Sequence, residues 1–99
     1  MKNNQDYLNL LRKIKNKPES SQRELAVELG FSLGKLNYCL KALKSKGLIK
    51  IANFRQNPNK INYIYVLTPK GIAAKTKLTI NFMKRTMQEY DQLKRELDK

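Results

Sequence analysis

Two short amphipathic segments joined by the turn Gly30-Phe31-Ser32 constrain the fold of this chain more than any other feature. In the first segment, Ser21 and Glu24 have the spacing of a capping box, in which the serine side chain binds the backbone N–H three residues on and the glutamate returns a bond. Gly30 then ends the helix. Apolar residues between Glu24 and Gly30 would form the buried face of this helix: Leu25, Ala26 and Leu29.

The second segment begins with another capping residue, Ser32, and ends at Lys46-Gly47. Its leucines follow the i, i+4, i+7 spacing of a helix face that packs on a core: Leu36, Leu40 and Leu43. The residues between them then point to solvent: Gly34, Lys35, Asn37, Tyr38 and Lys41. We therefore expect two helices in close succession, the second longer than the first.

The flanking sequence completes the pattern. Gln5 to Asn16 reads as an amphipathic helix whose apolar residues are Tyr7, Leu8, Leu11 and Ile14, with Leu10 flanking them. Leu48–Phe54 and Asn62–Leu67 read as the strands of a hairpin around the polar turn Arg55–Lys60. After the cap Thr68-Pro69, a final helix of roughly 28 residues would run to Leu97.

This order predicts a mainly α fold with a small β-hairpin (α+β), namely a winged helix-turn-helix with a long C-terminal helix. We expect residues 1–68 to form the winged domain and residues 69–99 the C-terminal helix. In such a fold the second helix of the pair lies in the major groove of DNA, and the first braces it across the backbone.

Charge indicates a polyanionic partner. The chain has 21 Lys and Arg against 8 Asp and Glu, a formal net charge of +13, and no carboxylate between Leu29 and Gln88. Ser21, Gln22, Ser32 and Lys44, together with Arg55 and Lys60 beside the hairpin turn, join the five solvent-facing residues as candidate DNA contacts. The alternatives are that Ser21 only caps its helix and that the charges are solvated.

Composition limits the other functions. With no histidine and one cysteine, Cys39, we expect no metal site, no cofactor and no enzyme activity. We read Cys39 as a small residue on the helix flank, with redox sensing as the alternative. Tyr63 and Tyr65 share one side of the second strand, where packing is favoured over base stacking. No apolar run could span a membrane or form a signal peptide, so a cytoplasmic protein is expected.

The final helix carries an apolar seam. Its residues alternate in steps of three and four, as in a coiled coil: Met83, Thr86, Tyr90, Leu93 and Leu97. Nothing else in the chain is obviously available to cover it, so the seam predicts a homodimer. The alternative is that the helix folds back over its own domain and covers Phe82 and Met87.

These motifs resemble MarR-type winged-helix regulators over roughly Tyr7 to Gly71. The matching segments are Ser21–Ala26, Gly30–Ser32, Leu40–Ile49 and Leu67–Gly71. The run Ser32–Leu43 resembles the compact branch associated with exopolysaccharide gene clusters. The resemblance implies a cytoplasmic homodimer that binds a pseudopalindromic operator, with Ser32–Lys46 in the major groove and the hairpin near the minor groove.

The chain also departs from that family. Typical members are longer and build the dimer interface and a small-molecule pocket from helices at both ends. Here the N-terminal extension is nearly absent, which puts a small-molecule effector in doubt and places dimerisation on the final helix, around Phe82 and the seam. A transcriptional regulator of polysaccharide-biosynthesis genes is the favoured interpretation, and a protein-docking module or an RNA-binding protein are the alternatives.

Overall fold

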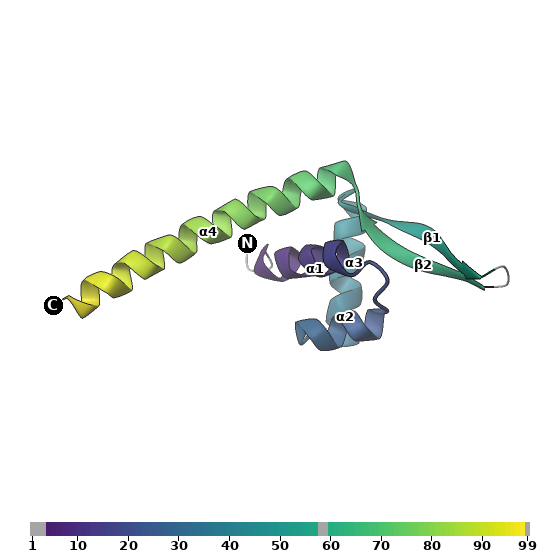
Figure 1. Ribbon diagram of the computed structural model, residues 1–99, viewed down its shortest axis with the longest axis horizontal. Helices are drawn as coiled ribbons and strands as arrows, with labels where there is room; N and C mark the ends of the chain where they lie inside the picture. Colours follow the sequence, from purple (N-terminus) through teal and green to yellow (C-terminus); the bar gives the residue numbers. More distant parts are fainter. Residues whose placement is uncertain (1–3, 58–59, 99) are drawn as a thin grey trace.

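The computed structural model describes residues 4–57 and 60–98, and the side chains of residues 54–62 lie outside that description. Helices α1, α2 and α3 form a compact body, from which a hairpin and the far part of α4 extend in opposite directions (Figure 1). The mainly helical winged architecture confirms the predicted fold class. In chain order the elements are α1 (Asn4–Asn16), α2 (Gln22–Leu29), α3 (Leu33–Ser45), β1 (Ile49–Asn57), β2 (Lys60–Leu67) and α4 (Pro69–Leu97).

The three predicted caps are present. Ser21, Ser32 and Thr68 each have extended backbone, and their side-chain oxygens accept hydrogen bonds of 3.0–3.1 Å from the N–H three residues on. At the end of α2, Gly30 takes a left-handed conformation with φ 71°, which an L side chain rarely adopts. Local sequence therefore sets where α2, α3 and α4 begin and where α2 ends.

The core lies where α1, α2, α3 and the first residue of β1 meet. Leu36, Leu40 and Leu43 are buried, as predicted. Leu10, read as a flanking residue, is completely buried instead. The buried residues that pack together are Tyr7, Leu10, Leu11, Ile14, Leu25, Ala26, Leu36, Cys39, Leu40, Leu43 and Ile49. The buried side of α1 is therefore wider by one residue than its simplest helical stripe indicates.

Cys39 belongs to this core, which corrects its predicted place on the helix flank. Its side chain is 2% exposed. The residue stands three positions after Leu36 and four before Leu43, so all three lie on one face of α3. Burial, with the carboxylate of Asp6 as a smaller cause, raises the pKa of the thiol. A raised pKa keeps the thiol protonated and argues against redox sensing.

The hairpin is antiparallel, with Ile49 opposite Leu67, Ile51 opposite Tyr65 and Asn53 opposite Tyr63. Its strands are longer than predicted. Backbone pairing continues through Arg55, which lies opposite Ile61, and an irregularity follows before Asn57. Residues 55–57 and 60 of the predicted turn are thus strand, because main-chain hydrogen bonds pair polar residues as readily as the apolar residues from which the strands were predicted.

One junction joins α3, the hairpin and α4. The backbone N–H of Leu48 donates to Leu43 of α3, and the carbonyl of Leu48 accepts from Thr68 at 3.0 Å. The Thr68 hydroxyl donates to the carbonyl of Gly47 at 2.6 Å. Gly71, in the first turn of α4, packs directly on Leu48, where a Cβ atom would overlap the carbonyl oxygen. The start of α4 is therefore held against the backbone between α3 and β1.

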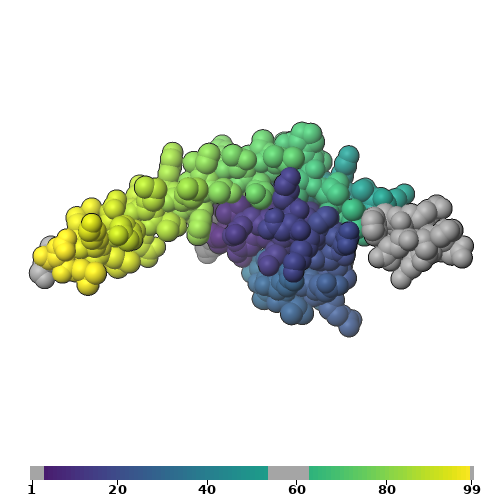
Figure 2. Space-filling model, viewed as in Figure 1, coloured from purple at the N-terminus to yellow at the C-terminus, as the bar shows by residue number. Residues whose placement is uncertain are grey.

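Beyond this junction, α4 continues without interruption past the body (Figures 1 and 2). Leu78 packs against the core cluster, whereas every residue from Ile80 to Asp98 is exposed. No helix in the described ranges has the length and apolar character needed to cross a membrane. Asn4 and Leu8 of α1 line a hollow together with residues of α4 from Leu78 to Gln88, so the helix extends away from the body beyond Gln88, with an apolar side exposed.

Replacing Gly71 with alanine should lower the free energy of unfolding by about 1–3 kcal/mol, because the new Cβ atom forces α4 away from Leu48. Chemical denaturation measures this. Gly34→Ala is the matched control, since nothing lies within 4 Å of a Cβ atom there. It should leave stability unchanged or raise it by up to about 1 kcal/mol. Equal stability of Gly71→Ala and the parent chain would contradict the close crossing.

The second prediction concerns Cys39. Because the thiol is buried and its pKa is raised, it should react with a thiol reagent at neutral pH far more slowly than cysteine in an unfolded peptide. Denaturant should restore the ordinary rate. The time course of labelling, followed by mass spectrometry, tests this, and rapid labelling of the native protein at pH 7 would show that the thiol is accessible.

Candidate nucleic-acid interface

The exposed face of α3 is the centre of the candidate interface. Leu36, Leu40 and Leu43 point into the core, which directs the opposite side of the helix to solvent. All the positions predicted to point outward are exposed, and Tyr38 is 63% exposed. The residues on the side away from the core are Gly34, Asn37, Tyr38, Lys41 and Lys44. They present an amide, a phenol and two ammonium groups with no carboxylate among them.

Lys35 differs from these residues although it is also exposed. Its ammonium lies 3.1 Å from a carboxylate oxygen of Asp6 on α1 and 4.4 Å from the centroid of the Phe31 ring. One residue before Leu36, it stands at the edge of α3 that faces α1. An ion pair at a partly exposed site contributes up to about 1 kcal/mol. Lys35 must release Asp6 before it can contact a base.

A groove of about 200 Å³ lies between α3 and the base of the hairpin. Across it, the side-chain amide of Gln22 donates a hydrogen bond of 3.2 Å to the hydroxyl of Tyr65. This contact joins the first turn of α2 to β2, so the hairpin is attached to the helix pair on the side where Asn37 and Lys41 are exposed. The groove is lined by Gln22, Asn37, Leu40, Lys41, Lys44, Ile51 and Tyr65.

The two tyrosines of β2 behave differently. Tyr65 is half-buried and packs against the core cluster, which confirms the expectation of packing. Tyr63 is 72% exposed, so that expectation is wrong for this residue. The reason is distance along the hairpin, because Tyr63 lies two residues farther from the body, where no helix covers it. Sequence alone could not find the contact of Gln22 with Tyr65, since 43 positions separate them.

The hydroxyls predicted to bind phosphate serve first as caps. Ser21 accepts from the N–H of Glu24 and also donates to its carboxylate, at 3.1 Å in each case. A negative charge beside this helix end disfavours a phosphate, so capping is the better interpretation of Ser21. Ser32 accepts from the N–H of Lys35 and has no such carboxylate among its hydrogen bonds.

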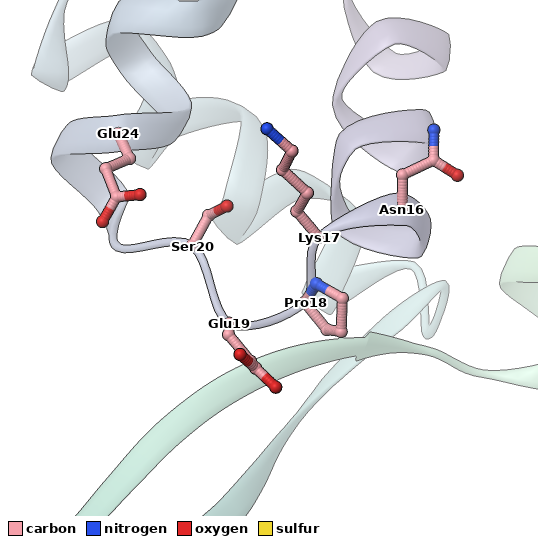
Figure 3. Close-up of a pocket in the computed structure, with 6 residues that line it drawn as sticks. All are labelled: Asn16, Lys17, Pro18, Glu19, Ser20 and Glu24. Atoms are coloured by element: carbon pink, nitrogen blue, oxygen red, sulfur yellow. The ribbon is translucent and has the colours of Figure 1, made fainter.

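Another hollow lies at the connection between α1 and α2 (Figure 3). Its volume is about 430 Å³, and its lining is Asn16, Lys17, Pro18, Glu19, Ser20 and Glu24. Close by, Lys17 and Lys13 pair with Glu28 at 3.4 Å, and the contact with Lys17 is the main cause that lowers the pKa of Glu28. All four carboxylates that precede α3 in the chain therefore lie on α1, on α2 or on the connection between them.

The remaining predicted residues lie on the hairpin and on α4. Arg55 and Lys60 are in the paired ends of β1 and β2, and their side chains fall outside the described ones. The predicted dimer residues are all exposed, and the exposed fraction of the apolar ones ranges from 40% at Phe82 to 84% at Leu97. Met87 is 63% exposed too, so its own domain leaves Met87 uncovered, although α4 lies beside α1 as far as Gln88. That set is Phe82, Met83, Thr86, Tyr90, Leu93 and Leu97.

Residues 8–50 match the model of a family described as winged helix-turn-helix DNA-binding. This part of the chain includes α2, α3 and the turn between them. No curated protein matches the chain by sequence.

Solved structures similar to the chain include MarR family regulators. MarR of Staphylococcus aureus, in complex with salicylate and kanamycin, has a TM-score of 0.67 at 20% identity, over 88% of this chain and 57% of that one. FabT of Streptococcus pneumoniae, in complex with DNA, has a TM-score of 0.62 at 22% identity, over 88% and 59%. A further MarR family transcription regulator reaches 0.69 at 22% identity, over 87% and 56%.

The chain thus spans somewhat more than half the length of these proteins. The described order of helices and hairpin agrees with both comparisons. Residues 8–50 therefore contain the helix-turn-helix, β1 and β2 supply the wing, and the chain has the fold of the MarR family regulators to which it is similar.

Proposed function

We propose that this protein is a transcriptional regulator that binds a specific sequence of double-stranded DNA as a homodimer. The observation that carries the proposal is the exposed face of α3, which presents Asn37, Tyr38, Lys41 and Lys44 within a stretch of sequence without carboxylates. A helix fits the major groove, about 12 Å wide, and a surface that meets phosphates must avoid negative charge. A protein-docking surface has no such requirement.

Each part of this face has a suitable chemistry. Asn37 can form two hydrogen bonds with an adenine edge, and Tyr38 can reach a phosphate or a thymine methyl. Lys41 and Lys44 border the groove toward the hairpin and can pair with phosphates. The bond from Gln22 to Tyr65 holds the hairpin beside α3, so the wing would follow the DNA toward the neighbouring minor groove. Arg55 and Lys60 are our proposed contacts there.

The apolar side of α4 supports the dimer. Large side chains such as Tyr90, Leu93 and Leu97 are more than half exposed on a helix that extends away from its own core. Exposed apolar patches of this kind mark protein interfaces. A second copy with the same stripe would cover both, and a two-fold dimer would read a pseudopalindromic site. Control of polysaccharide-biosynthesis genes is proposed only from the resemblance of residues 32–43.

Selection of duplexes from random-sequence DNA tests the proposal, with the solution mass of the protein measured alongside. We expect a pseudopalindrome whose half-sites are about one helical turn apart. On that duplex, Asn37→Ala should lose about 1–3 kcal/mol of discrimination against a changed adenine. Lys44→Ala should weaken binding to all DNA sequences alike. It should also reduce the slope of log affinity against log salt concentration by about one.

Fluorescence anisotropy at several salt concentrations separates these two effects. Lys15→Ala, which removes an exposed lysine in the last turn of α1, is the control. It should change neither the discrimination between sequences nor the salt slope. Weak, sequence-blind binding that disappears with salt would contradict the proposal and favour a docking or RNA-binding protein. Uniform losses for both Asn37→Ala and Lys44→Ala would contradict the division of roles.

The dimer has its own test. Leu93→Glu combined with Leu97→Glu should yield monomers, because the two new carboxylates cannot be buried in an interface without a partner charge. Sedimentation across a range of protein concentrations gives the mass. Gln92→Glu, on another side of the same helix, should leave the mass at two chains. A double variant that retains two chains would show that the seam is misassigned.

A further inference from the structure

Leu33 is an exposed leucine at the first position of α3. Its side chain is 47% exposed, whereas Leu36, Leu40 and Leu43 are nearly completely buried. The fold therefore gains less from a leucine at this position than from those three. In a helix-turn-helix, however, the N-terminal residues of the second helix are those that contact base edges.

The surroundings of Leu33 favour DNA over an apolar partner. Leu33 directly follows the cap Ser32, and Asn37 lies four residues on, so the two side chains are neighbours along one side of α3. Lys41 continues the same row one turn later. A single exposed leucine in a row of polar and basic residues does not form an apolar patch of the size that marks a protein interface.

Leucine has no hydrogen-bonding group, and the only apolar group that base pairs present in the major groove is the thymine methyl. We propose that Leu33 recognises the 5-methyl group of a thymine that lies next to the base contacted by Asn37. This inference rests on the proposed DNA-binding function and adds a specificity-determining residue to it. Tyr38 lies on another side of the helix and would contact a different position.

Deoxyuridine, which is thymidine without the 5-methyl group, provides the test. The probe is the duplex recovered by selection, with each thymidine replaced in turn. At one position per half-site, the parent protein should bind roughly fourfold more weakly, the loss expected when one apolar carbon is no longer buried. Leu33→Ala should bind with equal affinity to the duplexes that carry thymidine or deoxyuridine at that position. At any other thymidine whose replacement weakens binding of the parent protein, Leu33→Ala should show the same loss.

Two further variants complete the experiment. Leu33→Met keeps an apolar side chain of similar volume and should retain the preference for thymidine. Val27→Ala removes an apolar side chain that is 75% exposed on α2 and should leave the preference unchanged. Thermal unfolding checks that all variants are folded, which the exposure of both side chains favours.

The outcomes separate the inference from the function on which it rests. Specific binding in which Leu33→Ala retains every deoxyuridine effect, or in which no thymidine matters, overturns the role of Leu33 and leaves the regulator intact. Sequence-blind binding by the parent protein overturns both. Loss of the effect at one position in Leu33→Ala, with Leu33→Met and Val27→Ala like the parent, supports the inference.

Discussion

The packing of Gly71 on the carbonyl of Leu48 is the contact on which the arrangement of this protein depends. Three elements meet there: the end of α3, the base of the hairpin and the first turn of α4. Thr68 adds hydrogen bonds to Gly47 and Leu48. Because a backbone carbonyl cannot move aside as a flexible side chain can, the directions of α3, the wing and α4 are set together by this one crossing.

The carboxylates are confined to two parts of the sequence, residues 6–28 and residues 89–98, the second of these at the far end of α4. Carboxylates from Asp6 to Glu28 lie on α1, α2 and their connection, where Glu28 pairs with Lys13 and Lys17. The α3 face and the hairpin contain none. Lys35 stands at the boundary, since its ammonium is already paired with Asp6. Because this pair is already neutral within the formal net charge of +13, the positive charge offered to a polyanion comes from the other lysines and arginines.

Local patterns predicted most of the fold. The caps at Ser21, Ser32 and Thr68 each act within three residues, so the sequence beside them was sufficient. Properties that depend on distant segments were missed. Cys39 is buried in the core that α1, α2 and α3 form together, and Tyr65 meets Gln22 across 43 positions. The exposed α3 face followed from the buried leucines, whereas the engagement of Lys35 by Asp6 and the exposure of Leu33 required the tertiary structure.

The continuity of α4 has a consequence for cooperativity. No loop separates the crossing at Leu48 from the apolar stripe, so a partner bound to that stripe would be joined to α3 by helix alone. Flexible linkers lower the effective concentration of a second binding unit as they lengthen, and they lose conformational entropy when both units bind. A rigid connection avoids both losses but accepts only one separation between half-sites. In the proposed dimer, the stiffness of α4 therefore raises the avidity for an operator with the right spacing and lowers the affinity for operators with any other spacing.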